Sequence, residues 1–185
     1  MGSAVRREVP ALIGKTCLDR LAWPEEAVTV MLVPPPLVAL AAALAQRALT
    51  GATPAPSAGR ASATTIVSLA SVAMAGAAAS QFQRSGTTVE PFHPEQATVL
   101  VTNGANAISR NPMYVGLAGL LVAHAVWRGS WAALAPVAGF VVFIDRLQIQ
   151  AEEAALLEKF GAEYEAYRAS SPRWLDRRSL AVAKP

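Results

Sequence analysis

Two short segments of this chain combine residues that could bind a ligand and do chemistry on it. The first is Ser-Arg-Asn-Pro-Met-Tyr-Val-Gly, residues 109–116. Asn111 can cap a helix and Pro112 suits a first helical turn, so a helix is predicted to open here, with N–H groups and a positive dipole end that favour a carboxylate. Tyr114, one turn inside, could stack on a ligand or hydrogen-bond to it. The alternative is a well-capped helix start with an interfacial arginine and tyrosine.

The second segment places two carboxylates on or beside the apolar face of a predicted helix. Counted at about 100° per residue, Glu153 falls near the centre of an apolar stripe and Glu152 on its flank. A carboxylate on a buried face needs a partner or a change of pKa. Arg146, two turns earlier, projects to the same side and is one expected partner, a bound ammonium group is another, and Asp145 is expected to pair with Arg146. The stripe consists of Ile149, Leu156, Leu157, Phe160, Tyr164 and Tyr167.

The composition indicates a membrane protein rather than a soluble enzyme. Of the 185 residues 53% are hydrophobic and only 16% are charged, whereas roughly a quarter of a soluble domain is charged. The single cysteine, Cys17, rules out an internal disulfide, and two histidines offer little for zinc. With so few of these ligands, no metal site is expected. The formal net charge of +3 is mild, so a nucleic acid partner is not expected either.

Four apolar stretches are each near the roughly 20 residues that cross a bilayer. Because lipid cannot satisfy free backbone groups, they are predicted to be helices. The expected fold is therefore all-α: a polytopic membrane protein with about four transmembrane helices and a charged, cytoplasmic amphipathic helix at about 150–169. The third and fourth stretches are joined only by Arg128-Gly129-Ser130, which predicts a tight antiparallel hairpin. The stretches cover about 28–49, with the helix starting near Pro35, then 63–82, 113–127 and 131–149.

The distribution of lysine and arginine sets the expected orientation. With the N-terminus in the cytoplasm, only three of the 16 basic residues, Arg47, Arg60 and Arg128, lie on the opposite side. Both termini are therefore predicted to be cytoplasmic. The chain is interpreted as one domain over residues 1–185, with an N-terminal segment over 1–33, a core over 34–175 and a tail over 176–185.

In their order and spacing, these features resemble the isoprenylcysteine carboxyl methyltransferase family and its relatives among membrane phospholipid methyltransferases. That family shows an Arg-His-Pro-x-Tyr motif that opens a membrane helix, then a short hairpin, a Glu-Glu pair and Phe-Gly-x-x-Tyr-x-x-Tyr. The resemblance covers roughly residues 34–175 and implies an integral enzyme of a bacterial cytoplasmic membrane. The matching features are Arg110-Asn111-Pro112-Met113-Tyr114, the Arg128–Ser130 hairpin, Glu152-Glu153, Phe160-Gly161 with Tyr164 and Tyr167, the loop Gly86–Phe92 and the prolines Pro34–Pro36.

The resemblance implies S-adenosylmethionine as methyl donor, S-adenosylhomocysteine as product, and a lipophilic or lipidated acceptor that enters from the bilayer. The implied cofactor cavity faces the cytoplasm between the third and fourth helices and the 150–169 helix. Arg110 and Glu153 are the implied catalytic residues: Arg110 would hold an anionic group of the acceptor, and Glu153 or a water would take a proton from a thiol, amine or hydroxyl acceptor. The acceptor (isoprenylcysteine carboxylate-like, phospholipid, or small thiol or phenol) and the oligomeric state stay open. The implied cofactor-binding residues are Val101, Thr102, Asn103, Gly104, Asn111, Pro112, Met113, Tyr114, Glu152 and Glu153.

Two departures from the family pattern and one histidine add further expectations. Asn111 stands where the family usually has histidine; it keeps hydrogen bonding but cannot titrate near neutral pH. Gly104-Ala105-Asn106-Ala107 stands where relatives often have Gly-Pro-Tyr-Arg, so the cofactor lid or the acceptor site would differ. His124, within the third stretch, is expected to hydrogen-bond to a neighbouring helix, although an ionisable residue inside a membrane is also a functional hypothesis.

Two other functions fit parts of the pattern. One is a sterol-reductase-like membrane enzyme that uses NADPH, whose phosphates would call for more basic residues than Arg110 and Arg146. The other is a non-enzymatic membrane protein that binds a lipid or a partner. It predicts no cofactor affinity and explains Glu153 as part of a structural ion pair.

Overall fold

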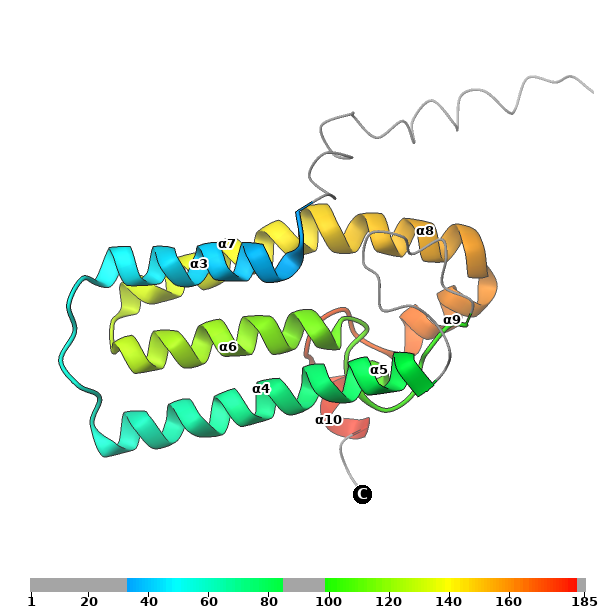
Figure 1. Ribbon diagram of the computed structural model, residues 1–185. Helices are drawn as coiled ribbons and strands as arrows, with labels where there is room; N and C mark the ends of the chain where they lie inside the picture. The colour runs from blue at the N-terminus through cyan, green and yellow to red at the C-terminus, as the bar shows by residue number, and fades with distance from the viewer. Residues whose placement is uncertain (1–32, 85–98, 183–185) are drawn as a thin grey trace, which may run out of the picture.

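The computed structural model describes residues 33–84 and 99–182, and the regular structure in these ranges is helical, without strands (Figure 1). The all-α prediction is therefore confirmed for this part of the chain. The predictions for Cys17, for the N-terminal segment up to residue 32 and for the loop Gly86–Phe92 fall outside the described residues.

Prolines and glycines set the ends of the first two helices. α3 (Pro35–Thr50) has proline in its first turn, as the sequence predicts. It ends at Gly51, whose φ of 58° suits a residue without a side chain. α4 (Ala58–Arg84) spans 27 residues and extends beyond both ends of the predicted 63–82 stretch.

The predicted hairpin between the third and fourth apolar stretches is confirmed. α6 (Pro112–Arg128) ends at Gly129, which adopts a left-handed conformation (φ 65°) and donates its N–H back to the last turn of α6. The chain then forms one unbroken helical run from Trp131 to Phe160. This run consists of the 3-10 turn η2 (Trp131–Ala133), α7 (Leu134–Phe143), the π-helical turn η3 (Ile144–Ile149) and α8 (Gln150–Phe160).

The single charged helix predicted at about 150–169 is wrong, because the chain breaks there into two helices. α8 ends at Phe160, and Gly161, with a φ of 49°, turns the backbone before α9 (Ala162–Ser170) begins. Glycine adopts this positive φ at little steric cost. The apolar period continues across the break, so periodicity alone did not reveal it.

The short helices α5 (Ala105–Ile108) and α10 (Arg177–Val182) gather with α9 at one end of the bundle (Figure 1). Tyr167 of α9 donates to the carbonyl oxygen of Asn106 in α5 at 2.7 Å. Ser179 of α10 donates its hydroxyl to the α5 backbone at 2.7 Å. The start of α6 and the whole of α8 lie at this same end, whereas the α3–α4 connector and the hairpin lie at the other.

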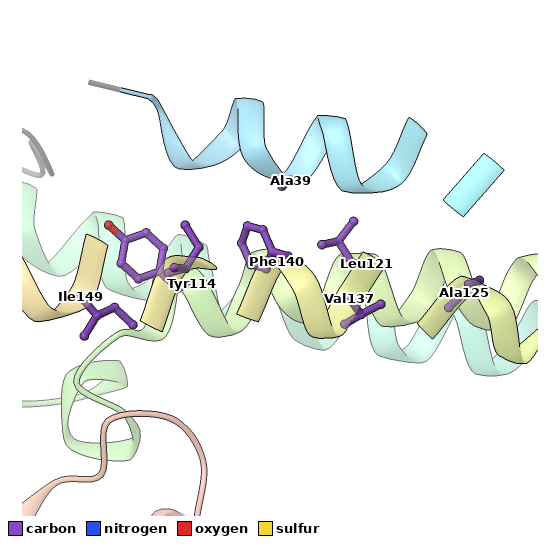
Figure 2. Close-up of a cluster of buried hydrophobic side chains, with 9 residues drawn as sticks. Ala39, Tyr114, Leu121, Ala125, Val137, Phe140 and Ile149 are labelled. Carbon is purple, nitrogen blue, oxygen red and sulfur yellow. The ribbon is translucent and has the colours of Figure 1, made fainter. Parts of the chain in front are cut away.

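α6 is the central helix of the bundle, with α4 on one side and α3 and α7 on the other (Figure 1). Buried apolar side chains line the seam between α3, α6 and α7 (Figure 2). Phe140 and Ile144 in this seam are almost fully buried, and burial of such side chains contributes roughly 1.5–3 kcal/mol each. The cluster consists of Ala39, Tyr114, Leu121, Ala125, Ala133, Val137, Phe140, Ile144 and Ile149.

α4 packs closely along α6 through small residues, which let the two helix backbones approach each other. A Cβ added at Gly116 would lie 2.8 Å from the Ala75 Cβ and 2.8 Å from the Ser71 carbonyl oxygen. A Cβ added at Gly119 would collide with the Ser71 hydroxyl. The two glycines of α6 therefore set the distance between the helices.

A buried polar cluster ties α3 to α6 and to η2. Gln46 is fully buried, and its Nε2 donates to the carbonyl oxygens of Leu121 at 2.9 Å and Ala133 at 2.8 Å. Its Oε1 lies 2.8 Å from Nδ1 of His124. The expectation that His124 bonds to a neighbouring helix is confirmed, and every polar atom of the Gln46 side chain has a partner.

Among the described residues, two helical segments are long and apolar enough to cross a membrane, judged by length and composition: α4 and the run Trp131–Phe160. α3 and α6, with 16 and 17 residues, are shorter than the roughly 20 residues of a typical span. The structure therefore supports two candidate spans rather than clearly four. Large apolar side chains are exposed on α3, α4 and α7, among them Leu44, Ile66 and Val142.

Replacing Gly116 by alanine should destabilise the fold, because the new methyl group meets α4. Such overpacking costs about 1–3 kcal/mol, and each kcal/mol lowers Tm by about 2–4 °C in a chain of this size. Gly76→Ala is the matched control, because nothing lies within 4 Å of a Cβ at that position of α4. Thermal unfolding of detergent-purified protein measures both variants, and an equal Tm for the two would contradict the close approach of α4 and α6.

Candidate active site

Glu153, the carboxylate predicted at the centre of the apolar stripe, is buried between two guanidinium groups. Arg110 Nη2 donates to Glu153 Oε1 at 2.7 Å. Arg173 donates to both carboxylate oxygens, with its Nε 3.1 Å from Oε1. Only 8% of Glu153 is exposed. The prediction that this residue faces inward is confirmed, and its charge is balanced within the protein.

The prediction that Arg146 pairs with Glu153 is wrong. The Arg146 side chain is 72% exposed and lies 3.6 Å from Asp145, which is the pair expected for Asp145. The π-helical turn η3 separates Arg146 from Glu153. Because a π turn takes one more residue than an α turn, it rotates the helix before it relative to the helix after it. The prediction assumed about 100° per residue throughout, and it therefore placed Arg146 on the wrong side of the helix.

Arg110 is surrounded by backbone oxygens from the segment that begins in the last turn of α9. Its Nη1 donates to the carbonyl oxygens of Arg168 and Ser171, each at 3.0 Å. Its backbone N–H donates to the carbonyl oxygen of Pro172 at 2.8 Å. The Nε of Arg110, in contrast, is buried without a hydrogen-bond partner in the described part of the chain. Such an unpaired donor is unfavourable unless a ligand satisfies it.

A hollow of about 340 Å³ opens beside Arg110. Its lining comes from Arg110, Glu165, Arg168 and Ala169. Two guanidinium groups and one carboxylate therefore present both signs of charge to a ligand. The volume lies at the lower end of the roughly 300–1,000 Å³ that small-molecule sites occupy.

Tyr114 and Glu152 form a second pair between α6 and α8. The Tyr114 hydroxyl donates to Glu152 Oε1 at 2.5 Å, and Gln148 Nε2 donates to the same oxygen at 2.7 Å. Within the described ranges, no hydrogen bond reaches the second oxygen, Oε2. Glu152 is therefore held in place by one oxygen and can still accept a hydrogen bond from a ligand through the other.

The start of α6 is held by the C-terminal segment rather than by an asparagine cap. Asn111 occupies the N-cap position and Pro112 the first turn, as predicted. The Asn111 side chain makes no capping hydrogen bond, however, because its Nδ2 donates to the carbonyl oxygen of Arg173 at 3.0 Å. Ser109 Oγ donates to the same carbonyl oxygen at 3.0 Å. The predicted side-chain cap is wrong because an acceptor distant in sequence takes the amide.

Residues 171–174 complete the site, and the sequence reasoning missed them. Arg173 Nη1 lies 3.2 Å from Asp145 Oδ1, and Trp174 Nε1 donates to the same oxygen at 2.9 Å. Pro172 is buried. The sequence does contain a recognisable pattern here, because a proline is followed by an arginine and a tryptophan. This pattern lies after Tyr167, the last residue of the apolar stripe, so the helical periodicity did not include it.

The segment Val101–Gly104 is attached to α4 rather than to the acidic pair. Its first residue is buried and the other three are exposed. Asn103 Oδ1 accepts a hydrogen bond from Gln81 of α4 at 3.1 Å, and a Cβ at Gly104 (φ 57°) would collide with the same glutamine. No hydrogen bond among the residues described joins this segment to the acidic pair. The predicted residues that the structure brings together are Arg110, Asn111, Pro112, Met113, Tyr114, Glu152 and Glu153.

Burial and ion pairing hold Arg173 and two tyrosines of α9, Tyr164 and Tyr167, in one protonation state at neutral pH. The hydrogen bond to Glu153 is the main reason that the pKa of Arg173 is raised above its usual value. Burial raises the pKa of Tyr164 to about 12, and burial also raises the pKa of Tyr167. Arg173 therefore stays cationic, and the two tyrosines stay neutral hydrogen-bond donors.

Comparison with known proteins identifies the family of this helical bundle. Residues 61–163, more than half of the chain, match the model of the phospholipid methyltransferase family. The chain belongs to this family of membrane isoprenylcysteine and phospholipid methyltransferases, so the resemblance inferred from its motifs is confirmed. It is therefore a methyltransferase, and the family indicates a lipid-type acceptor.

One relative and the solved structures complete the comparison. An uncharacterized protein of Haemophilus influenzae is 40% identical over 63 residues, which make up 34% of this chain and 100% of that protein. No solved structure matches the chain. The matched family model therefore carries the assignment.

Arg173→Gln should destabilise the protein, because it removes one of the two cations that balance Glu153. Arg110 remains and Arg173 is 30% exposed, so we expect a loss of about 1–2 kcal/mol rather than the full cost of breaking a buried pair. Arg178→Gln is the matched control, because its pair with Asp176 is exposed by 49% and 43% and such a solvated pair should contribute little to stability. Thermal unfolding measures the stability of both variants. Equal losses of stability would show that the Arg173–Glu153 pair contributes no more than an exposed ion pair.

Proposed function

We propose that this methyltransferase takes its methyl group from S-adenosylmethionine and transfers it to the polar head of a lipophilic acceptor. The reaction would take place at the end of the bundle that carries Arg110 and Glu152, with S-adenosylhomocysteine as the second product. The observation that carries the proposal is the meeting of two carboxylates with Arg110 and Tyr114 where α6 opens against α8. Family membership supports methyl transfer, and these contacts support placing the donor and the acceptor at this end of the bundle.

Glu152 suits the ammonium group or the ribose hydroxyls of the cofactor. Tyr114 and Gln148 hold its Oε1, which leaves Oε2 to accept from a ligand. Glu153 is a predicted catalytic and cofactor-binding residue, but because Arg110 and Arg173 occupy its carboxylate, we assign it to holding Arg110 in place. The other residues assigned to the cofactor are Asn111, Pro112, Met113 and Tyr114 on the α6 side, and Val101, Thr102, Asn103 and Gly104 beside the adenosyl part.

Arg110 suits the anionic group of the acceptor. Its buried Nε has no partner within the described residues, and its side chain lines the hollow shared with Glu165 and Arg168. A carboxylate or phosphate oxygen placed there would pair with the Arg110 guanidinium through a charge-assisted hydrogen bond, which is roughly twice as strong as a neutral one.

Methyl transfer needs alignment more than acid–base assistance. A sulfonium donor supplies an activated methyl group, so the chain has to align the reacting atoms and exclude water. With a carboxylate acceptor, the new O–C bond forms as the S–C bond breaks, its electron pair goes to sulfur, and no proton moves. An amine, thiol or hydroxyl acceptor must also lose a proton, which Glu152 or a water would take because Glu153 is occupied by its two arginines.

Four helices would cross the membrane in this proposal, with α3 and α6 added to the two candidate spans. The exposed Leu40 and Leu44 of α3 support contact with lipid. Most of the basic residues that the structure describes gather at the end that carries α8 and α9. This supports a cytoplasmic location for that end and for both termini, in a bacterial cytoplasmic membrane.

The other functions considered have no observation in their favour. The family match gives no support to a sterol-reductase-like enzyme that uses NADPH. A purely structural role for Glu153 in a non-enzymatic protein would leave the open oxygen of Glu152 and the buried Nε of Arg110 without a purpose.

Isothermal titration of detergent-purified protein with S-adenosylhomocysteine should show binding, which Glu152→Gln should weaken about tenfold or more, or about 1.4 kcal/mol. The amide keeps the shape of the side chain but loses the charge that attracts the cofactor ammonium. Glu158→Gln, which changes an exposed carboxylate of the same helix, should bind as the wild type does. Equal affinity in Glu152→Gln would remove this residue from the cofactor site, and a wild type that does not bind would overturn the choice of donor.

Incubating protein-containing membranes with methyl-labelled S-adenosylmethionine tests the reaction itself. We expect label in the lipid extract or on lipidated protein, and a rate that falls about tenfold or more in Arg110→Gln because the acceptor anion loses its cation. Label released by alkali as methanol would identify a carboxylate acceptor, whereas alkali-stable label would identify an amine or a thiol. Labelling no higher than in membranes without the protein would refute the proposal.

A further inference from the structure

The end of the bundle opposite the proposed active site carries arginine that no acid of the described residues compensates. Arg47 lies in the last turn of α3, Arg60 in the first turn of α4 and Arg128 in the last turn of α6, and these turns share one end of the bundle (Figure 1). The carboxylates in the described ranges belong to residues 145–176, toward the other end. Within those ranges, none of the three arginines forms an ion pair with a carboxylate.

Two of these guanidinium groups are fixed where three chain segments converge. Arg128 Nε donates to Thr50 Oγ1 at 2.8 Å, and its Nη2 donates to the carbonyl oxygen of Gly51, so it links α6 to the end of α3. Arg60 Nη2 donates to the α3–α4 connector at 3.2 Å. A Cβ added at Gly129 would collide with Arg60 Nη1, so Arg60 covers the residue that follows Arg128. Neutral oxygens therefore hold both cations at the hairpin.

These neutral contacts leave positive charge uncompensated. The C-terminal ends of α3 and α6 offer roughly half a negative charge each, which balances only about one of the two cations. Donors also remain: Nη1 of Arg128, and Nε and Nη1 of Arg60, have no hydrogen-bond partner among the residues described. An anion at this position would relieve the repulsion and accept from both guanidinium groups.

The surroundings identify the anion as the phosphate of a membrane lipid. Trp131 and Trp127 flank the hairpin and are 88% and 44% exposed, and tryptophan is enriched at the depth of lipid headgroups. Leu49 and Leu134 are exposed at the same end and offer apolar surface to acyl chains. Arginine binds phosphate through parallel N–H···O bonds. A lipid headgroup that has a phosphate but no ammonium group carries a net negative charge, which would balance the arginines at this end.

We propose that Arg60 and Arg128 form a binding site for the phosphate of one anionic phospholipid, separate from the methyl-transfer site. The proposal rests on the membrane insertion proposed above but not on the donor or the acceptor. α3 and α4 each pack on α6 and lie on opposite sides of it (Figure 1). A lipid bound at this site therefore links the connector between them to the hairpin.

Native mass spectrometry of the detergent-purified full chain, titrated with phosphatidylglycerol, tests the site. We expect one lipid per chain, with an affinity about tenfold or more above that for phosphatidylcholine, and a loss of about tenfold or more in Arg60→Gln/Arg128→Gln. Arg47→Gln is the matched control, because Arg47 is an exposed charge at the same end whose side chain forms no hydrogen bond or ion pair with the described residues. A screened surface charge contributes little, so its loss should be about threefold at most.

The single variant Arg60→Gln keeps the test valid if the double variant does not fold, because it leaves the Arg128–Thr50 bond intact. Equal losses in Arg60→Gln and Arg47→Gln would overturn the site in favour of general charge attraction, as would equal affinity for phosphatidylcholine. Binding of S-adenosylhomocysteine without a phosphatidylglycerol site would refute this inference alone. A phosphatidylglycerol site without S-adenosylhomocysteine binding would refute the proposed donor and leave the lipid site standing.

Discussion

The buried Glu153 carboxylate is stable in this fold because Arg110 and Arg173 reach it from either side in the sequence. A buried charge without a partner costs several kcal/mol, so the start of α6, the first turn of α8 and the segment after α9 have to meet. That meeting also brings Tyr114 against Glu152 and draws residues 171–174 across the opening of α6. One electrostatic requirement thus assembles most of the candidate active site.

The rest of the bundle supports this meeting by fixing its central helix, α6. Gly116 and Gly119 bring α4 close on one side, while Gln46 ties α3 and η2 to α6 on the other. The two ends of α6 have different charged surroundings. Its start lies among the carboxylates and their arginines. Its end, Arg128, lies where the described part of the chain offers no acid to balance it. The proposed methyl transfer and the proposed lipid site therefore lie at opposite ends of one rigid element.

Several features of the fold and the site follow from local sequence signals. Proline at the start of α3 and α6, glycine after α3, α6 and α8, and the three-residue hairpin link all act on backbone geometry within one turn. The inward position of Glu153 follows from the apolar period, because the residues that share its stripe are also local. The break at Gly161 is also set by a single local residue, but the prediction missed it because the apolar periodicity continues through it.

The sequence by itself determined the helical class, the hairpin, the family and the presence of an inward carboxylate, because composition, period and motif order depend only on neighbouring residues. Only the tertiary structure decided which cations meet Glu153, where Asn111 donates, and that residues 171–174 belong to the site. The π-helical turn changed the angle between Arg146 and Glu153, and Arg173 arrives from a segment that no helical period connects to α8. Contacts between residues that are distant in sequence depend on how the helices pack. Local sequence patterns do not specify that packing.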